Sequence, residues 1–476
     1  MKYKELNQRI DDMKGEIIEG IRQSVSIYSV KSNPEPDAPF GKGPKDALEN
    51  AIEQAEKLGL KAKNIDNRIG YAEIGEGDEM VAILGHLDVV PLGDGWSHDP
   101  LAAEIHDGIM YGRGVSDDKG PTIGSLYALK AIKDLGLEHG RRIRVIFGAD
   151  EESGSSCVAH YIKSGEEIPV AGFTPDADFP IINAEKGMFS CVLRKKLDNN
   201  MNYRLKQLSG GTVKNVVMPN LKFEIETDLI LNINGETHTG NVCCEIAGKS
   251  AHASTPEKGE NALLKLADNL RNSSFEGDLK DFLDFMNNEI NMETDGNTLG
   301  VFCEDSESGK LTLNIGVIDY DGESISFTVD SRVPVTFSPE DVMEGIRKKA
   351  EKYGITMEST NIVRPLFVPA ESELIKKLSN VYEAQTGEKT SLIGIGGGTY
   401  AKSFPDMVAF GPSFPGETII FISLMNISVW ILLLEESRFL LQQYSSSQTK
   451  LSISLKRASV MTEALYRFFI WEQALR

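Results

Sequence analysis

The sequence predicts an α/β protein of two domains, with a mainly parallel sheet in one domain and an α+β segment inserted into it. First, 476 residues exceed what one hydrophobic core usually serves. Second, apolar strands alternate with helical segments over 1–186 and again over 365–417. Third, residues 187–364 alternate in the manner of antiparallel strands. A tail, 418–476, differs in character from all of these segments.

The first segment reads as strands and helices in turn. Residues 5–25 and 46–59 have the apolar spacing of helices, and the loop SNPEPDAPFGKGP separates them. MVAILGHLDVVP and RRIRVIFGADEESGS are apolar strands that run into polar loops, and between them KGPTIGSLYALKAIKDLG predicts a helix that ends at Gly136. Ligands of such sheets bind beyond the carboxyl ends of the strands, so we expect a site in these loops.

The inserted segment has a different pattern. KFEIETDLILNING, NVCCEIAGKSAHAS, LTLNIGVIDYDG and SISFTVDSRVPV predict antiparallel strands, and ENALLKLADNLRN and SPEDVMEGIRKKAEKYG predict helices. After residue 365, ELIKKLSNVYEAQTG and TSLIGIGGGTYA return to a helix, a strand and a Gly-rich loop. We therefore expect the insertion to form a domain of its own.

Composition limits the partners and the compartment. The formal charge of −21 and the pI near 4.9 argue against nucleic acid and anionic membranes as partners. Five cysteines without a CxxC pair indicate a reducing compartment, and the charged N-terminus has no signal-peptide pattern. We therefore expect a cytoplasmic protein, and the sequence leaves its oligomeric state open.

Two polar motifs follow the first strand. Gly85-His86-Leu87-Asp88 places an imidazole two residues from a carboxylate, and a ligating histidine needs such a group to hold its second nitrogen. YGRGVSDDKG contains the adjacent acids Asp117 and Asp118, which are costly to bury unless a cation binds them. Taken singly, the first motif is better explained by a structural histidine, and the second is equally well explained by a helix-capping turn.

Two further acidic motifs follow in order along the chain. Asp150, Glu151 and Glu152 come directly after a predicted strand, and FTPDADFP brings Asp176 after a proline. One histidine and three carboxylate sites then arise at successive loops of one layer, which is a zinc-type ligand set. Two ions about 3.5–4 Å apart would need one carboxylate to bridge them.

Six motifs in order resemble those of the aminoacylase/carboxypeptidase/dipeptidase metallopeptidases: GHLDVVP, YGRGVSDDKGP, DEESGS, TPDADFP, GKSAHAS and GGGTYA. The long insertion and the segment from TPDADFP to NAEKG are most similar to the PepV-type dipeptidases, relatives of carnosinase. The resemblance covers residues 1 to about 417. It implies a two-domain di-zinc exopeptidase with a catalytic domain from 1–186 and 365–417 and a lid domain from 187–364.

The resemblance also implies a ligand for each position of the metal centre. His86 and Asp176 would bind one zinc, Glu152 would bind the second, and Asp117 would bridge both. Zinc is the expected metal, with two ions per chain, and manganese or cobalt remain possible because carboxylate-rich sites accept several divalent ions.

The resemblance assigns three residues to catalysis. Glu151 would be the general base that deprotonates a metal-bridging water and passes the proton to the leaving amine. Asp88 would orient His86. His252, in SAHAS, would stabilise the tetrahedral oxyanion.

The resemblance assigns substrate binding to the inserted segment and the Gly-rich loop. Arg332 in VDSRVPV would clamp the substrate carboxylate, and Asn215 in GGTVKNVVMP would lie near the substrate. The backbone N–H groups of Gly396, Gly397 and Gly398 would bind the same carboxylate. The remaining histidines match no ligand motif, and we expect them to be structural or exposed: His98, His106, His139, His160 and His238.

The implied activity is hydrolysis of dipeptides, or short peptides with a free C-terminal carboxylate, by a zinc-bridged hydroxide. The expected partner is therefore a small peptide substrate. Two alternatives stay open: an N-acyl amino acid deacylase of the same family, and a metal-deficient inactive relative.

The second alternative arises from the tail. The family pattern needs a further metal-binding histidine in a segment like His-Gln-x-Asn-Glu-Tyr-Ile, but this sequence has no histidine after His252. We hypothesise a frameshift, because codons for Phe421 to Ile431, read one base earlier, can encode Phe-His-Gln-Leu-Asn-Glu-Tyr-Ile-Ser-Val-Asp. Alternatively, 418–434 is a membrane anchor, although it is shorter than the roughly 20 residues of a spanning helix, or the tail is a genuine replacement.

Overall fold

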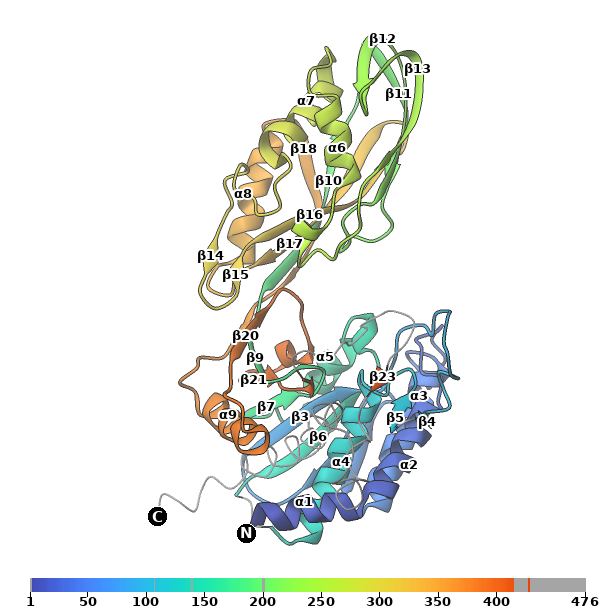
Figure 1. The fold of residues 1–476 in the computed structure, drawn as a ribbon. Helices are drawn as coiled ribbons and strands as arrows, with labels where there is room; N and C mark the ends of the chain where they lie inside the picture. Colours follow the sequence, from blue (N-terminus) through green and yellow to red (C-terminus); the bar gives the residue numbers. More distant parts are fainter. Residues whose placement is uncertain (1, 107, 138–139, 199–201, 415–426, 429–476) are drawn as a thin grey trace, which may run out of the picture. The chain divides into compact units, whose positions relative to one another are not determined.

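The computed structural model divides the chain into two compact units (Figure 1). It describes residues 2–106, 108–137, 140–198, 202–414 and 427–428. Unit 1 comprises Met1–Asn183, Val368–Ile393 and the described residues from Thr399 on, and unit 2 comprises Ala184–Phe367 and Gly394–Gly398. The tail predicted over 418–476 lies outside the described residues, apart from 427–428.

Unit 1 is built on a mixed sheet with the strand order β1-β2-β6-β3-β7-β21-β9. Its central strands β6, β3, β7 and β21 run parallel, whereas the pairs β1–β2, β2–β6 and β21–β9 are antiparallel. The strands are β1 (Lys61–Ile65), β2 (Ile69–Ile74), β3 (Met80–His86), β6 (Arg142–Gly148), β7 (Ala171–Thr174), β9 (Ile181–Glu185) and β21 (Met407–Ala409). The predicted α/β class is confirmed, with antiparallel strands added at both flanks.

The central strand β3 is buried at all seven positions, and all but the first residue of its neighbour β6 are buried. Continuous apolar runs of this kind are typical of parallel strands that are covered on both faces. Helix α4 lies over β3 and β6 (Figure 1). The helices of unit 1 are α1 (Lys2–Asp12), α2 (Lys14–Val25), α3 (Lys42–Lys57), α4 (Lys119–Asp134), α5 (Ser156–Lys163) and α9 (Glu373–Thr386).

Several short strands lie outside this sheet or at its margin. A hairpin of β4 (Glu104–His106) and β5 (Ile109–Tyr111) pairs with β23 (Ile427–Ser428). β22 (Pro412–Ser413) pairs in parallel with β8 (Ala177–Asp178). β20 (Leu392–Ile395) pairs with β9.

Unit 2 contains a seven-stranded antiparallel sheet with the order β13-β12-β11-β16-β17-β10-β18. Strand β10 alternates buried and half-buried residues, as expected of a sheet with one covered face. Figure 1 shows α6, α7 and α8 on the same face of this sheet. The long strands are β10 (Gly187–Lys196), β11 (Tyr203–Gly210), β12 (Asn220–Ile233), β13 (Glu236–Ala247), β16 (Thr312–Tyr320), β17 (Ser324–Val333) and β18 (Ile355–Val363).

The remaining elements of unit 2 are short. The helices are α6 (Ala262–Asn269), α7 (Gly277–Phe285) and α8 (Pro339–Glu351), and the short strands are β14 (Glu304–Asp305), β15 (Gly309–Lys310) and β19 (Leu366–Phe367). Helix α8 begins where the sequence predicts: the Ser338 side chain accepts a hydrogen bond from the Asp341 N–H, and Pro339 occupies the first turn. A separate α+β unit within the inserted segment is therefore a correct prediction of fold class.

One detail differs from the sequence patterns. Residues 5–25 form two helices, α1 and α2, because the backbone at the buried Met13 leaves the helical conformation (φ −90°, ψ 3°). Among the described residues, no helix has both the length and the apolar character that crossing a membrane requires. The alternative of an anchor over 418–434 falls almost entirely outside that part of the chain.

Candidate metal centre

Loops at one edge of the unit 1 sheet bring the acidic motifs to His86. His86 is the last residue of β3 and lies beside Gly148, the last residue of the parallel strand β6. Glu151 and Glu152 follow β6 in a single 3-10 turn. Asp117 lies just before α4, and Asp176 follows β7. These side chains meet because the carboxyl ends of parallel strands lie at the same edge of the sheet, as the sequence predicts.

His86 is fully buried and presents one nitrogen to the carboxylates. Its Nδ1 lies 2.9 Å from the backbone carbonyl oxygen of Asp88, so Nδ1 carries the proton and donates it there. Its Nε2 has no hydrogen-bond partner, but lies 3.1 Å from Asp117 Oδ1 and 3.7 Å from Asp176 Oδ2. An imidazole nitrogen that faces two carboxylates, while the other ring nitrogen donates to a backbone carbonyl, is the arrangement of a metal ligand.

Four carboxylates surround this nitrogen in two groups. The atoms of His86, Glu151 and Asp176 that could bind an ion lie within 4.8 Å of one another, and so do those of His86, Asp117 and Glu152. Within the described ranges no second histidine joins either group. The cluster therefore offers more carboxylate than imidazole ligands.

Burial and mutual repulsion raise the pKa values of three of these acids. Burial, followed by neighbouring carboxylates, raises the pKa of Glu151 to about 8, that of Glu152 to about 7 and that of Asp176 to about 6. Four acids gathered in this way repel one another when ionised, and a divalent cation among them would remove the repulsion.

Burial and the neighbouring carboxylates act on the pKa of the histidine in opposite directions. Burial by itself lowers the pKa of His86, but Asp117, Asp176 and Asp88 outweigh burial and hold that pKa well above its usual range. A proton and a metal ion therefore compete for the same ring nitrogen.

Asp88 positions two parts of the cluster at once. Its carboxylate accepts hydrogen bonds from the backbone N–H groups of Glu151, at 3.0 Å, and Glu152, at 3.1 Å. Its backbone carbonyl holds the His86 ring, and its Oδ1 lies 3.6 Å from His86 Nδ1. The Asp88 carboxylate thus holds the loop after β6, and its backbone carbonyl contacts the His86 ring; a role in orienting a metal ligand stays a prediction.

Asp118 is a buried acid that the sequence left without a role. Its Oδ2 accepts hydrogen bonds from the His86 backbone N–H, at 3.1 Å, and from Thr122 Oγ1, at 3.0 Å. The Asp118 carboxylate occupies space that a side chain at position 85 would need, because a Cβ there would lie 2.5 Å from Asp118 Oδ2. Gly85 is therefore required before His86.

Tyr400 is a second residue that the sequence analysis missed. It is buried, its ring meets His86 edge-on with 6.1 Å between centroids, and its hydroxyl lies 2.8 Å from Cys157 Sγ in a hydrogen bond. A Cβ at Gly148 would lie 2.3 Å from the Tyr400 hydroxyl. The only sequence signal was its place beside the glycines of GGGTYA.

Unit 2 brings together the predicted substrate-binding residues. Val216 forms an isolated antiparallel bridge with His252, and the Ala253 N–H donates to the Asn215 carbonyl at 2.9 Å. His252 Nδ1 accepts from the Ser254 N–H at 3.2 Å, so Nε2 carries the ring proton and can donate it. Partial burial, and then the charge of Arg332, lower the pKa of His252.

Arg332 is buried in unit 2, where its guanidinium contacts Met188 Sδ and makes three hydrogen bonds to oxygen atoms. Its Nε donates to Asp330 Oδ1 at 2.8 Å, its Nη2 to Asp330 Oδ2 at 3.4 Å, and its Nη1 to the Gly396 carbonyl at 3.3 Å. Gly396 also lies against Ser254, since a Cβ there would be 2.9 Å from Ser254 Cβ. Gly397 and Gly398 continue the same segment of unit 2.

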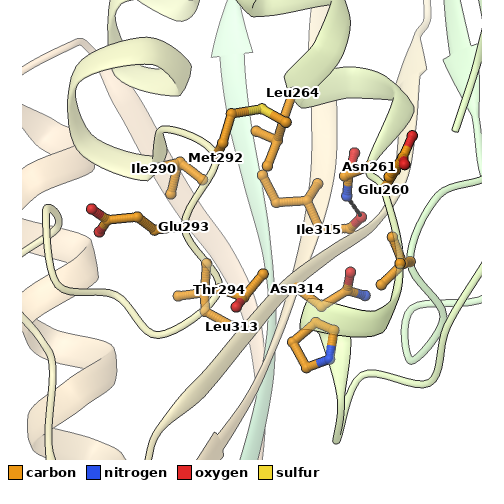
Figure 2. Close-up of a pocket in the computed structure, with 13 residues that line it drawn as sticks. Glu260, Asn261, Leu264, Ile290, Met292, Glu293, Thr294, Leu313, Asn314 and Ile315 are labelled. Carbon is orange, nitrogen blue, oxygen red and sulfur yellow. Dashed lines mark hydrogen bonds between the residues drawn. The ribbon is translucent and has the colours of Figure 1, made fainter. Parts of the chain in front are cut away.

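Figure 2 shows a cavity of about 80 Å³ elsewhere in unit 2. Leu264, Ile290, Met292 and Leu313 line it, and the Asn261 amide beside it donates to the Ile315 carbonyl at 2.8 Å. It contains none of the predicted site residues, and it is smaller than the roughly 300–1,000 Å³ of most ligand pockets. It does not compete with the His86 cluster as a candidate site.

Comparisons with known proteins bear on these clusters. The model of peptidase family M20/M25/M40 matches residues 82–420. "Putative dipeptidase YtjP" from Bacillus subtilis (strain 168) is 38% identical over 426 residues, which are 85% of this chain and 91% of that protein.

Two solved structures share the fold. Human carnosine dipeptidase 1 superposes with a TM-score of 0.57 at 15% identity and covers 98% of this chain and 99% of its own. The di-peptidase Dug1p from Saccharomyces cerevisiae gives a TM-score of 0.57 at 13% identity, with 98% of both chains covered. The family resemblance inferred from six motifs is thereby confirmed, and the chain belongs to peptidase family M20/M25/M40.

Proposed function

We propose that this protein hydrolyses dipeptides with a free C-terminal carboxylate in a reaction that depends on divalent metal ions. One observation carries the proposal: Nε2 of the buried His86 has no hydrogen-bond partner and faces Asp117 and Asp176. The dipeptidase name of the Bacillus subtilis relative supports the substrate class.

The residues of the cluster fit a metal ion. A buried imidazole nitrogen and several carboxylates with raised pKa values form a donor set for zinc, manganese or cobalt. His86, Asp117 and Asp176 would hold the first ion, and Asp117 and Glu152 would hold the second. When bound, such ions lower the pKa of water and polarise a peptide carbonyl.

Glu151 would act as the proton carrier of the reaction. It follows β6 beside Glu152, and its backbone is held by Asp88. Its carboxylate would take a proton from the attacking water and deliver it to the nitrogen of the leaving amine. Glu151 and Glu152 can take the different roles of base and ligand, because a carboxylate that binds an ion has less affinity for a proton than one that does not.

The residues of unit 2 would recognise the peptide. His252, with its proton on Nε2, would donate a hydrogen bond to the developing oxyanion. Arg332, held by Asp330, would bind the terminal carboxylate, with Asn215 and the backbone of Gly396, Gly397 and Gly398 beside the substrate.

The test is hydrolysis of a simple dipeptide by the purified chain with added zinc or manganese and with a chelator control. Glu151→Gln is the variant of interest, and Glu56→Gln on the exposed surface of α3 is its matched control. A panel of tripeptides and N-acyl amino acids separates a dipeptidase from an N-acyl amino acid deacylase. Metal-independent turnover, or turnover of acyl amino acids alone, would contradict the proposal.

A second candidate function follows from the ligand count. If His86 and Asp176 hold the first ion and Glu151 serves as the base, only Asp117 and Glu152 of the described cluster remain for a second ion, which favours a metal-deficient relative without turnover. A folded chain that binds at most one ion and hydrolyses nothing in the panel would establish this alternative.

A further inference from the structure

We propose that His98, Glu104 and His106 form an additional binding site for one divalent transition-metal ion, separate from the His86 cluster. The candidate ligand atoms of these three residues lie within 4.8 Å of one another. None of the three belongs to the proposed peptidase centre. The sequence patterns predicted only structural or exposed histidines here, because no spacing typical of a ligand motif joins them.

Contacts within the cluster already point the three side chains toward one another. His106 Nε2 lies 2.8 Å from Glu104 Oε2, and His98 Nδ1 lies 3.4 Å from the same oxygen. The two imidazole rings stack with 4.2 Å between centroids and 18° between planes. One carboxylate oxygen thus lies within reach of a nitrogen from each of two histidines.

The backbone explains why these side chains share one place. Glu104 and His106 are two residues apart on β4, so they project from the same face of the hairpin. Tyr111 pairs with Glu104 across the hairpin, and its ring lies 4.3 Å from that of His98. The preceding loop therefore brings His98 onto a face that the hairpin has already defined.

Two imidazoles and one carboxylate suit zinc or copper(II), which favour nitrogen donors over the oxygen ligands of magnesium and calcium. The side chains of His98, Glu104 and His106 are 25%, 43% and 48% exposed, so an ion can enter and retain water as a further ligand. Such an ion would tie the loop at His98 to the hairpin whose second strand leads to Arg113 and on to Asp117.

The experiment counts ions on the full chain. Protein stripped with a chelator is dialysed against zinc, and bound zinc is measured for the parent and for the double variant His98→Asn, His106→Gln. We expect one fewer zinc per chain in the variant, however many ions the His86 cluster holds. The matched control is His160→Asn, since His160 also pairs with a carboxylate, Asp66 at 2.8 Å, but lacks a second imidazole.

Fluorescence quenching by copper(II) provides a second measurement, which is local to the proposed site. Trp96 lies two residues before His98, and the other two tryptophans, Trp430 and Trp471, can be replaced by Phe in the parent and the variants. Copper(II) should quench Trp96 fluorescence in this parent, and quenching should need more than roughly 100-fold more copper once two of three ligands are removed. Glu104→Gln should weaken quenching less than the double variant does.

Each outcome decides the matter. Loss of one zinc and of copper quenching in the double variant, with His160→Asn unchanged, supports the site. Equal zinc content and equal quenching in the parent and in a double variant with an unchanged melting temperature would overturn it. If the double variant unfolds, Glu104→Gln in the folded state provides the same comparison.

Discussion

Two clusters of histidine and carboxylate in unit 1 use the same residue types in opposite surroundings. In the cluster at His86, burial is the first cause that raises the pKa of Glu151 to about 8 and that of Glu152 to about 7. In the cluster at His98, the hydrogen bond to His106 lowers the pKa of the exposed Glu104. Water solvates the second cluster, whereas the first is stabilised only by protons or cations. The comparison teaches that a buried set of acids requires protons or a cation, while an exposed set only admits them.

The largest expected effect comes from Glu151→Gln. This change keeps the shape of the side chain but removes the group that accepts a proton, so kcat should fall by about 10²–10⁴-fold. Zinc content should stay the same, because Glu151 is proposed as a base and not as a ligand. Steady-state kinetics and metal analysis on one preparation check both, with Glu56→Gln as control. If zinc content fell together with kcat, Glu151 would be a ligand.

The pH dependence of stability distinguishes metal-free from metal-loaded protein. The folded pKa values of Glu151 and Glu152, about 8 and about 7, exceed the ordinary value of 4.5. Their contribution to stability is therefore fully present below pH 4.5 and is lost as pH rises through about 7 to 8. The metal-free protein should lose a few kcal/mol, of the order implied by 1.36 kcal/mol per pKa unit, between pH 5 and pH 8.

Metal loading should reverse this trend, because the ion binds the deprotonated carboxylates. Denaturant unfolding of both forms across this pH range measures the difference. The comparison also cancels Lys119, whose pKa burial lowers to about 7 and whose charge costs stability at low pH in both forms. Parallel pH profiles for the two forms would show that the ion binds elsewhere.

A smaller effect is expected from Asp88→Asn. Asparagine keeps one carbonyl oxygen for the N–H groups of Glu151 and Glu152, but loses the charge and one acceptor. Losses of this kind beside a metal site typically cost about 10–100-fold in metal affinity. Competition with a chromophoric chelator measures it, and Asp46→Asn, which removes a partly exposed ion pair with Lys42 on α3, is the control. Unchanged affinity would remove Asp88 from the account.

The smallest effect concerns Tyr400→Phe. The variant removes the hydroxyl that pairs with Cys157 Sγ and keeps the ring against His86, so the free energy of unfolding should fall by about 1 kcal/mol. Tyr28→Phe, at an exposed tyrosine, should change stability by less than that. Denaturant titration compares the two variants, and a loss of metal with Tyr400→Phe would show that the hydroxyl matters for more than packing.

The sequence predicted the fold class and the convergence of His86 with the acidic loops, because both follow from strand order in a parallel sheet. It could not predict the parts that depend on tertiary packing. The contact of Tyr400 with His86 joins segments far apart in the chain, and only their packing shows it. Likewise, Asp118 differs from Asp117 only in the direction of its side chain, which adjacency in sequence does not reveal.

The His98 cluster was missed for another reason. Its three residues are separated by six and two positions, a spacing typical of no ligand motif, and they meet only because a loop folds back onto the β4–β5 hairpin. The tail presents the converse case. The sequence shows that no histidine follows His252, but residues 415–426 and 429–476 lie outside the described structure. The frameshift remains a hypothesis that the nucleotides of the gene would decide.

The most direct test of the account titrates zinc into chelator-stripped protein while bound zinc and dipeptide hydrolysis are measured together. We predict no hydrolysis in the stripped protein, turnover that rises with zinc bound at the His86 cluster, and neither tight zinc at that cluster nor turnover in His86→Ala. Hydrolysis that persists without metal, or a folded chain that fills the cluster with zinc and leaves every dipeptide intact, would contradict the proposed function.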